Sequence, residues 1–381
     1  MIVPGFHSTD DQAVLIEAVR DYARAELIDK DRAWDVDECS VAEVLPELAA
    51  MGLMNLCLPE AHGGLGCSYR TYANILHEIA YASPSAAVTL SVHNMVGMIV
   101  SQSAGEACKA DWLADWGSPE SFAAFAVSEA GAGSDISSCT TEAKRVKGGY
   151  RVNGEKMWIT NGMHARWFFT IVRTDPTEAK TGLTAMLVDG QADGLGRDKI
   201  TGKTGIRGSE TAVIAFDDVF VPDEHLLGSE GGGMKVGLSG LDGGRIGIAS
   251  QATGIAAACL DQMVGYAKQR QQFKQSISGF QAIQTMIADS ATDLSAARLL
   301  VGQAADRVDA GHMDPAASAK AKLFASEAAN RIAYRAVQIH GGSGYVRECR
   351  VEQLARDARI TTLYEGTSEI QRLVIGRDLL Q

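Results

Sequence analysis

Residues 145–160 read RVKGGYRVNGEKMWIT. Apolar and polar residues alternate on both sides of Gly148-Gly149, a period of two that is typical of β-strands, and the glycine pair predicts a two-residue hairpin turn. Further β-rich segments bounded by turn residues follow, namely ARWFFTIVRT, GLTAMLVDG and ETAVIAFDDVFVP. We therefore expect a β domain in the middle of the chain, over residues 121–230.

The chain before this β region has a helical pattern. Between Asp10 and about Trp116, apolar residues recur with the spacing of one helix face, interrupted by a loop at 59–68. Ser83-Pro84 is typical of a helix N-cap followed by proline at the first helical position. These features predict an N-terminal α-helical domain over residues 1–120.

The chain after the β region is helical again. Asp314-Pro315 has the pattern of an N-cap and first helical residue, and Gly341 fits the position just after a helix end. Long segments with apolar stripes predict a C-terminal four-helix bundle over residues 231–381. The fold class is therefore α+β, with a β-barrel-like middle domain between two helical ones. The helices are expected at 234–270, 280–310 and 315–340, with a final pair from 351 to the end.

The composition is that of an acidic globular protein. With 47 Asp+Glu against 35 Lys+Arg, the formal net charge is −12, which disfavours nucleic acid or an anionic membrane as a partner. The start, MIVPGFHSTDD, lacks the features of a secretory signal, and the longest apolar stretch, 86–100, is too short to span a bilayer. We expect a soluble, cytoplasmic protein without a membrane span. The seven cysteines show no C-x-x-C spacing and are expected to be reduced.

Glycine is overused, with 40 residues against 8 prolines, and no familiar nucleotide motif accounts for it. GAGSD at 131–135 and GGSG at 341–344 do not match G-x-G-x-x-G, and the helix–β–helix order also argues against a Rossmann enzyme. The sequence contains no H-E-x-x-H, Walker loop, G-x-S-x-G or cluster of His and Cys ligands. We therefore expect no metal site and no hydrolase of these kinds.

Several segments combine glycine, hydroxyl, aromatic and acidic residues. Small residues in the first permit close backbone approach to a phosphate or a planar ring, and Glu365 precedes a glycine beside apolar neighbours, where shielding favours a base. Each segment taken alone also fits an ordinary loop, a packed strand, a capped helix end or a surface carboxylate. The segments are FAVSEAGAGSDISS (125–138), KMWITNG (156–162), RQQFKQSISGFQ (270–281), QIHGGSGY (338–345) and LYEGTSEIQR (363–372).

Together with RIGIASQATGIA at 245–256, these segments resemble the acyl-CoA dehydrogenase family over essentially the whole chain, nearest to its short-chain and branched-chain members. The resemblance implies that FAD lies between the β domain and the C-terminal bundle, and that a neighbouring subunit of a homotetramer completes its site. It also implies an acyl-CoA substrate and an electron-transfer flavoprotein that accepts the electrons.

The resemblance also assigns site residues by motif. Substrate contacts fall on two glycine-containing segments and on one serine shared with the cofactor: Ser134, Asp242, Gly243, Gly244, Arg245 and Gly366. Cofactor contacts fall on the segments quoted above, some of them across the subunit contact: Phe125, Val127, Ser128, Gly133, Ser134, Trp158, Ile159, Thr160, Arg270, Phe273, Gln281, Gln338, Ile339, His340, Gly341, Gly342, Thr367, Ser368 and Glu369.

The same resemblance makes Glu365 the catalytic base. It implies that Glu365 removes the pro-R α-proton of the acyl thioester while the β-hydrogen leaves as hydride to the flavin. Donors to the thioester carbonyl, implied to be the Glu365 backbone N–H and a flavin hydroxyl, would stabilise the developing enolate. Some branches of the family place the base just before Arg245, but Gly244 holds that position here and cannot accept a proton.

The acyl group is a separate question. Met95 and Met98 lie in a stretch that resembles the pocket floor of short-chain and branched-chain members, although methionine at this spacing also fits plain core packing. We expect a short or branched acyl-CoA as the substrate and the trans-2-enoyl-CoA as the product, with medium chains as an alternative. An oxygen-using acyl-CoA oxidase-like flavoenzyme, and an assembly protein without activity on the same fold, also stay open.

Overall fold

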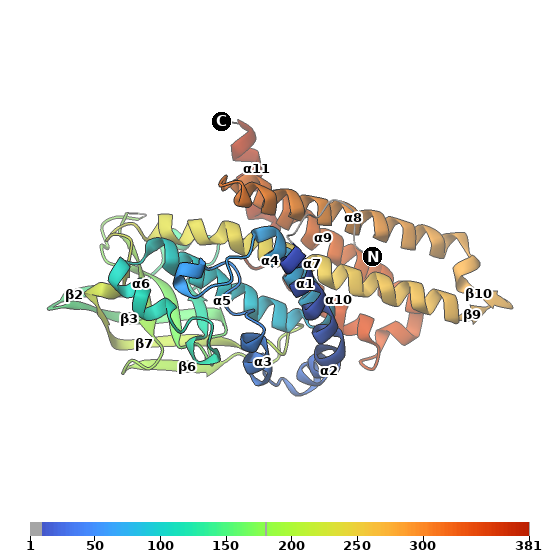
Figure 1. The fold of residues 1–381 in the computed structure, drawn as a ribbon, viewed down its shortest axis with the longest axis horizontal. Coiled ribbons are helices and arrows are strands. Elements are labelled where there is room, and N and C mark those ends of the chain that lie inside the picture. Colours follow the sequence, from blue (N-terminus) through green and yellow to red (C-terminus); the bar gives the residue numbers. More distant parts are fainter. Residues whose placement is uncertain (1–9, 180, 381) are drawn as a thin grey trace.

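A computed structural model describes residues 10–179 and 181–380. The strands gather at one end of the long axis of the molecule and the long C-terminal helices extend to the other, with the N-terminal helices packed between and beside them (Figure 1). Most of the segment used to argue against a secretory signal, residues 1–9, lies outside the described residues. Within the described ranges, no helix is long and apolar enough to cross a membrane.

The N-terminal third is helical, as expected. Ser83 caps one helix, because its side chain accepts a hydrogen bond from the Ala86 N–H, and Pro84 occupies the first helical position. A short π-helical stretch at Ala23–Leu27 connects the first two helices. The helices are α1 (Asp10–Tyr22), α2 (Ile28–Asp37), α3 (Leu45–Ala50), α4 (Tyr69–Ala82), α5 (Pro84–Ser103) and α6 (Glu106–Leu113).

The middle of the chain forms one eight-stranded sheet in the order β6-β7-β3-β2-β4-β5-β8, with β1 added in parallel beside β4. Most other pairs are antiparallel, and one face of the sheet buries a core of aliphatic and aromatic side chains. The strands are β1 (Ala123–Ala126), β2 (Glu142–Val146), β3 (Gly149–Thr160), β4 (Trp167–Arg173), β5 (Leu183–Asp189), β6 (Leu195–Lys199), β7 (Thr211–Pro222) and β8 (Leu226–Leu227).

The β2–β3 hairpin differs from its prediction by one residue. Val146 pairs with Gly149, so the two-residue turn is Lys147-Gly148 rather than Gly148-Gly149. Gly148 has φ +81°, which suits a hairpin turn of this length. Gly149 is the first strand residue instead, and a Cβ there would lie 2.2 Å from the Val221 carbonyl oxygen, because β7 passes directly beside it.

Three long helices dominate the C-terminal part: α7 (Gly233–Gln269), α8 (Gln281–Asp309) and α9 (Pro315–His340). They pack along one another, and α10 (Arg350–Ile360) and α11 (Ser368–Leu380) pack on α9. Helix α4 also lies along α7 and α8, which joins the two helical regions in a shared apolar core. The predicted Asp314 N-cap and Gly341 helix end are confirmed, since Asp314 accepts from the Ala317 N–H and Gly341 has φ +59°.

A small hairpin, β9 (Gln271–Gln272) and β10 (Gln275–Ser276), connects α7 to α8 at the far end of the long axis from the main sheet (Figure 1). Near its start, α7 touches the sheet, because a Cβ at Gly237 would lie 2.7 Å from Ile171 on β4. From there the helix continues to Gln269, which at 1.5 Å per residue corresponds to about 50 Å. The start of α7 therefore contacts the main sheet, and its end leads into the β9–β10 hairpin.

Candidate active site

Glu365 lies in the loop between α10 and α11, in a left-handed backbone conformation with φ +50°. The residue is partly exposed, but its Oε2 atom is buried and has no hydrogen-bond partner among the described residues. Burial raises the pKa of this carboxyl to about 7, although Arg245 and then Lys322 oppose the shift by favouring the charged form. Such a carboxylate is a competent proton acceptor near neutral pH.

The glycines predicted at the substrate site face this carboxylate. A Cβ at Gly244 would lie 2.6 Å from Glu365 Oε2 and 2.7 Å from Met95 Sδ, so only glycine leaves room for the carboxylate at this position. One residue earlier in α7, a Cβ at Gly243 would lie 2.9 Å from the Tyr69 hydroxyl. Both glycines are buried, and they open the side of α7 that faces Glu365 and α4.

Asp242 and Arg245 form a buried ion pair one helical turn apart on α7, with 2.5 Å between Oδ1 and Nη1. Burial raises the Asp242 pKa and the Arg245 guanidinium opposes this. The Arg245 Nε atom is buried without a partner in the described chain. The pair thus brings the Arg245 guanidinium close to Glu365, while Asp242 neutralises much of the guanidinium charge.

A pocket opens beside these residues between α4, α5 and α7. Ile99 restricts it on the α5 side, because a Cβ at Gly240 would lie only 2.3 Å from Ile99 Cδ1. Met95 belongs both to this pocket and to the space around the Glu365 carboxylate, which connects the two. The lining residues include Tyr69, Tyr72, Met95, Ile99, Gly240 and Gly243.

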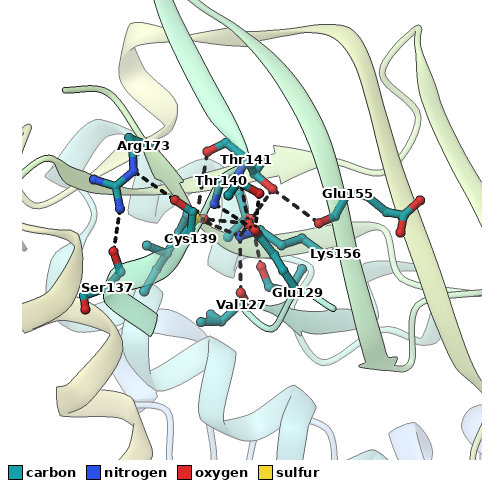
Figure 2. A network of polar contacts seen from close by, with 12 residues as sticks. Val127, Glu129, Ser137, Cys139, Thr140, Thr141, Glu155, Lys156 and Arg173 are labelled. Atoms are coloured by element: carbon teal, nitrogen blue, oxygen red, sulfur yellow. Dashed lines mark hydrogen bonds and ion pairs between the residues drawn. The ribbon is translucent and has the colours of Figure 1, made fainter. Parts of the chain in front are cut away.

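The segment that follows β1 is held by a buried polar network (Figure 2). Lys156 of β3 is fully buried, and its Nζ lies 2.8 Å from Glu129 Oε1 and 3.2 Å from the Val127 carbonyl oxygen. Glu129 also accepts hydrogen bonds from the backbone N–H groups and hydroxyls of Thr140 and Thr141. Burial raises the Glu129 pKa, but Lys156 and these donors outweigh it and hold the pKa well below its usual range.

The network fixes the first two predicted cofactor segments relative to each other. Besides the ion pair, the Met157 N–H donates to the Ser128 carbonyl at 2.8 Å. Gly133 and Ser134 lie further along the same loop and are exposed, and a Cβ at Gly133 would meet nothing within 4 Å. The outer side of this loop is therefore open and backed by a rigid strand.

Trp158 is displayed by a β-bulge. The register of β3 against β7 shifts between Lys156 and Ile159, and Trp158 adopts φ +64° with 59% of its surface exposed. Ile159 points into the core, and Thr160 is partly exposed. The simple alternation predicted for this strand is therefore interrupted by the bulge, which places a large ring at the surface beside the loop at 127–134.

Phe125 connects the sheet to the Glu365 loop. Its ring stacks on Phe169 with centroids 4.9 Å apart, and it packs with Tyr364 against a small apolar cluster formed by Val88, Val92, Ile206 and Ile248. Val127 is buried in the neighbouring core. Thr367, Ser368 and Glu369 continue from the Glu365 loop into α11, where the Thr367 hydroxyl accepts from the Ile370 N–H.

The remaining predicted cofactor residues lie elsewhere. Arg270, Phe273 and Gln281 are exposed on or beside the far hairpin, Phe273 by 87% of its surface. The end of α9 lies there too, because the His340 ring stacks on Tyr266 of α7 with centroids 4.2 Å apart. Within one chain, therefore, Gln338, Ile339, His340, Gly341 and Gly342 join the hairpin group and do not meet the loop at 127–134 (Figure 1).

Sequence reasoning missed the charged residues that support the site, namely Lys156, Glu129 and Lys322. Lys322 on α9 is fully buried, and its Nζ donates to the Gly366 carbonyl at 2.7 Å. A signal was present, because Lys322 is four residues after Ser318 and three before Ala325, in the phase of the buried stripe of its helix.

Comparison with known proteins fits this arrangement. Sequence-family models match the chain at 9–120, 124–219 and 231–380, described as the N-terminal, middle and C-terminal domains of acyl-CoA dehydrogenase. An acyl-CoA dehydrogenase of Bacillus subtilis is 40% identical over 98% of this chain and 99% of its own. The chain belongs to the acyl-CoA dehydrogenase family. It is thus an oxidoreductase, and the fold predicted by resemblance is confirmed.

Relatives of this acyl-CoA dehydrogenase include the human mitochondrial short-chain specific enzyme, 40% identical over 97% of this chain and 90% of that one. Among solved structures, butyryl-CoA dehydrogenase from Megasphaera elsdenii superposes with a TM-score of 0.96 at 35% identity and full coverage of both chains. A chain from a study of the electron-transferring flavoprotein of Acidaminococcus fermentans gives the same TM-score at 36% identity over 99% of each chain.

Members of the family are FAD-dependent, and the residues present suit this cofactor. Trp158 offers an exposed planar ring, and Gly131 and Gly133 beside it carry no side chain and face open space. A dinucleotide with a flat ring system needs both features, a stacking surface and close backbone approach. Among the described residues, no group of three or more His, Cys, Asp or Glu is placed to hold a metal ion.

Proposed function

We propose that this acyl-CoA dehydrogenase oxidises a short or branched acyl-CoA to the trans-2-enoyl-CoA, with Glu365 as the base. The observation that carries the proposal is the buried Oε2 of Glu365, which has no hydrogen-bond partner among the described residues and lies against Gly244 next to the pocket. A buried carboxylate without a partner is costly unless a bound group uses it. The α-carbon of an acyl thioester, bound in the adjoining pocket against the Glu365 carboxylate, would present the proton that this oxygen accepts.

The chain's own residues carry out the proton transfer. The substrate Cα–H bond breaks, its proton forms an O–H bond on the Glu365 carboxylate, and the electron pair shifts toward the thioester carbonyl. FAD, when bound, would supply the two-electron oxidation that takes up the β-hydrogen as hydride, and the electron pair from Cα then forms the Cα–Cβ double bond. Burial of the site excludes water from the developing enolate, which strengthens each donor that faces it.

The preference for short chains rests on the walls of the pocket. Met95 and Ile99 are both buried, Met95 reaches Gly244, and Ile99 lies against Gly240 at the next turn of α7. These side chains close the pocket beyond the carboxylate, which leaves little room for a long acyl tail. The similarity to short-chain specific relatives supports the same preference.

The cofactor site is proposed to use two chains. The loop at 127–134 and Trp158 belong to the sheet region, and Phe125, just before the loop, packs with Ile248 in the middle of α7. Arg270 and Phe273 lie beyond the end of α7 at Gln269, which is about 30 Å along the helix from Ile248. One FAD is too short to contact both groups of a single chain. We therefore propose a homotetramer in which the hairpin of one subunit completes the FAD site of another, and an electron-transfer flavoprotein as the acceptor.

An anaerobic titration tests the function. Purified protein should be yellow, and butyryl-CoA or isobutyryl-CoA should bleach its flavin absorbance. A series from four to twelve carbons, assayed with an artificial acceptor, should give the highest kcat/KM at the short end. Absence of bleaching by every acyl-CoA in the series would sink the proposal, and a maximum at eight or more carbons would remove the short-chain preference. Faster reoxidation by air than by the flavoprotein would favour the oxidase alternative.

A further inference from the structure

Lys322 is a buried cation that the mechanism above does not use. It lies on α9 with 0% of its surface exposed, among alanines such as Ala321 and Ala325. Lysine is almost never fully buried unless its ammonium is paired, because desolvation of the charge is costly. Its Nζ lies 2.7 Å from the Gly366 carbonyl oxygen, directly after the base. The ammonium group therefore pairs with the backbone of the Glu365 loop.

The same carbonyl has a second donor. Gln371 of α11 donates through Nε2 to the Gly366 carbonyl at 3.0 Å and to the Glu365 carbonyl at 2.9 Å. Glu365 and Gly366 have φ +50° and +83°, so the loop passes through two left-handed residues in a row. A residue other than glycine in this conformation is strained and persists only where its surroundings hold it. Lys322 and Gln371 supply that support.

Charged groups approach the Glu365 carboxylate from several elements. Arg245 on α7 and Lys322 on α9 both favour its ionised form, whereas burial opposes ionisation. The carboxylate also adds to the effect of burial in raising the pKa values of Tyr72 on α4 and of Tyr364 in the same loop. Burial in turn lowers the Lys322 pKa to about 8, and the Arg245 charge acts in the same direction. The carboxylates of Glu365, Glu369 and Glu327 oppose this shift, Glu365 most strongly.

We propose that Lys322 is a positioning residue for the base: its ammonium clamps the Gly366 carbonyl, which holds Glu365 in its left-handed turn above Gly244, and its charge keeps the carboxylate ready to accept a proton. The inference rests on the proposed function of Glu365. Arg245 is committed to Asp242 through its buried ion pair, whereas Lys322 donates to the loop itself, so the two cations act differently.

Three variants separate the clamp from the charge. Lys322→Met removes both, Lys322→Gln keeps a neutral donor, and Gln371→Leu keeps the charge but removes the other donor. Lys320→Met is the matched control, because Lys320 lies on the same helix and is exposed. All are expected to retain FAD, as judged by the ratio of flavin to protein absorbance.

Stopped-flow flavin reduction by butyryl-CoA should slow at least tenfold in Lys322→Met and less in Lys322→Gln. In both variants, the acid limb of the pH profile, where kcat/KM falls as the base becomes protonated, should move up by about one pH unit. This shift is expected when one nearby opposite charge is removed. Gln371→Leu should slow reduction without moving the limb, and Lys320→Met should match the wild type. An unmoved limb and an unchanged rate in Lys322→Gln would overturn the proposal, even if Lys322→Met does not fold.

A measurement without turnover separates this proposal from the proposed function. The carboxyl band of Glu365, assigned in infrared spectra by its loss in Glu365→Gln, reports the pKa of the base directly. This pKa should rise in Lys322→Gln. If butyryl-CoA bleaches the wild type but the band titrates at the same pH in both proteins, the role of Lys322 is wrong. If the band shifts and no acyl-CoA bleaches the flavin, the role of Lys322 holds and the function is wrong.

Discussion

Gly244 faces Glu365 so closely that a single added carbon would lie 2.6 Å from the carboxylate oxygen. Helix α7 and the loop before α11 are far apart in sequence, yet together they form one narrow space, with Met95 of α5 as its third wall. The position where the family resemblance implies that some relatives carry their base is therefore adjacent in space to the base proposed for this chain. A carboxylate at position 244 on α7 or at position 365 in the loop before α11 would therefore face the same pocket.

Substituting Gly244 by alanine should displace the Glu365 carboxylate. The added Cβ would contact both Glu365 Oε2 and Met95 Sδ, and a shift of about 1 Å in a reacting group can cost about a hundredfold in rate. We expect kcat to fall by that order while FAD stays bound. Gly265→Ala is the control, because Gly265 lies on the same helix with nothing within 4 Å of a Cβ. It should keep full activity, and equal rates in the two variants would contradict the geometry.

Replacing the proposed base by a neutral amide should slow proton transfer strongly. Glu365→Gln preserves the size of the side chain but cannot accept the α-proton, so flavin bleaching by butyryl-CoA should slow by about 10²–10⁴-fold. The flavin content and visible spectrum of the resting protein should be unchanged. Rapid anaerobic bleaching in this variant would remove Glu365 from its proposed role.

Activity should rise with pH through the pKa of Glu365. The base acts as a carboxylate, and burial places its pKa at about 7. Below that pH the carboxyl is protonated and kcat/KM, which reports the free enzyme, should fall tenfold per pH unit. Initial rates between pH 5 and 9 with saturating acceptor check this. An acid limb near the ordinary glutamate value of about 4.3 would show that the site is not desolvated as described.

The buried Glu129–Lys156 pair should matter for stability and for cofactor retention. Lys156→Met leaves the Glu129 carboxylate uncompensated and should lower the free energy of unfolding by about 3–5 kcal/mol. The double variant Glu129→Gln with Lys156→Met should be less destabilised than Lys156→Met alone. Denaturant titration measures both effects, and FAD affinity should fall because the loop at 127–134 loses its anchor.

The exposed pair Lys144–Glu142 on the neighbouring strand provides the comparison. Lys144→Met should change the free energy of unfolding by less than about 0.5 kcal/mol and leave FAD binding unchanged. Similar losses of unfolding free energy in Lys144→Met and Lys156→Met would mean that burial of the Glu129–Lys156 pair does not increase its effect on stability.

Local rules made much of the fold predictable. Ser83 and Asp314 begin their helices as N-caps, and Gly341 ends one, because capping depends on a few neighbouring residues. The long C-terminal helices also end within a residue or two of their predicted limits. Glu365 and the glycines around Gly244 were identified by resemblance, and the structure brings them together.

The rest depends on contacts that a local pattern does not contain. The hairpin turn lies one residue earlier than predicted, and Gly149 is instead a strand residue that β7, some seventy residues away in sequence, approaches too closely for a side chain. The bulge that turns out Trp158 arises likewise from pairing with β7. The phase of α9 indicates that Lys322 is buried, but no local pattern identifies the partners of Lys322 and Lys156, which are the backbone of a distant loop and a buried carboxylate.

The length of α7 has a genetic consequence. If the two halves of each FAD site come from different subunits, a chain damaged at Phe273 and a chain damaged at Trp158 fail in different sites of the same assembly. In a mixed pair, one site combines both defects and the other combines neither. Two inactive proteins mixed during refolding should therefore yield active ones, an intragenic complementation that a chain with a self-contained cofactor site cannot show.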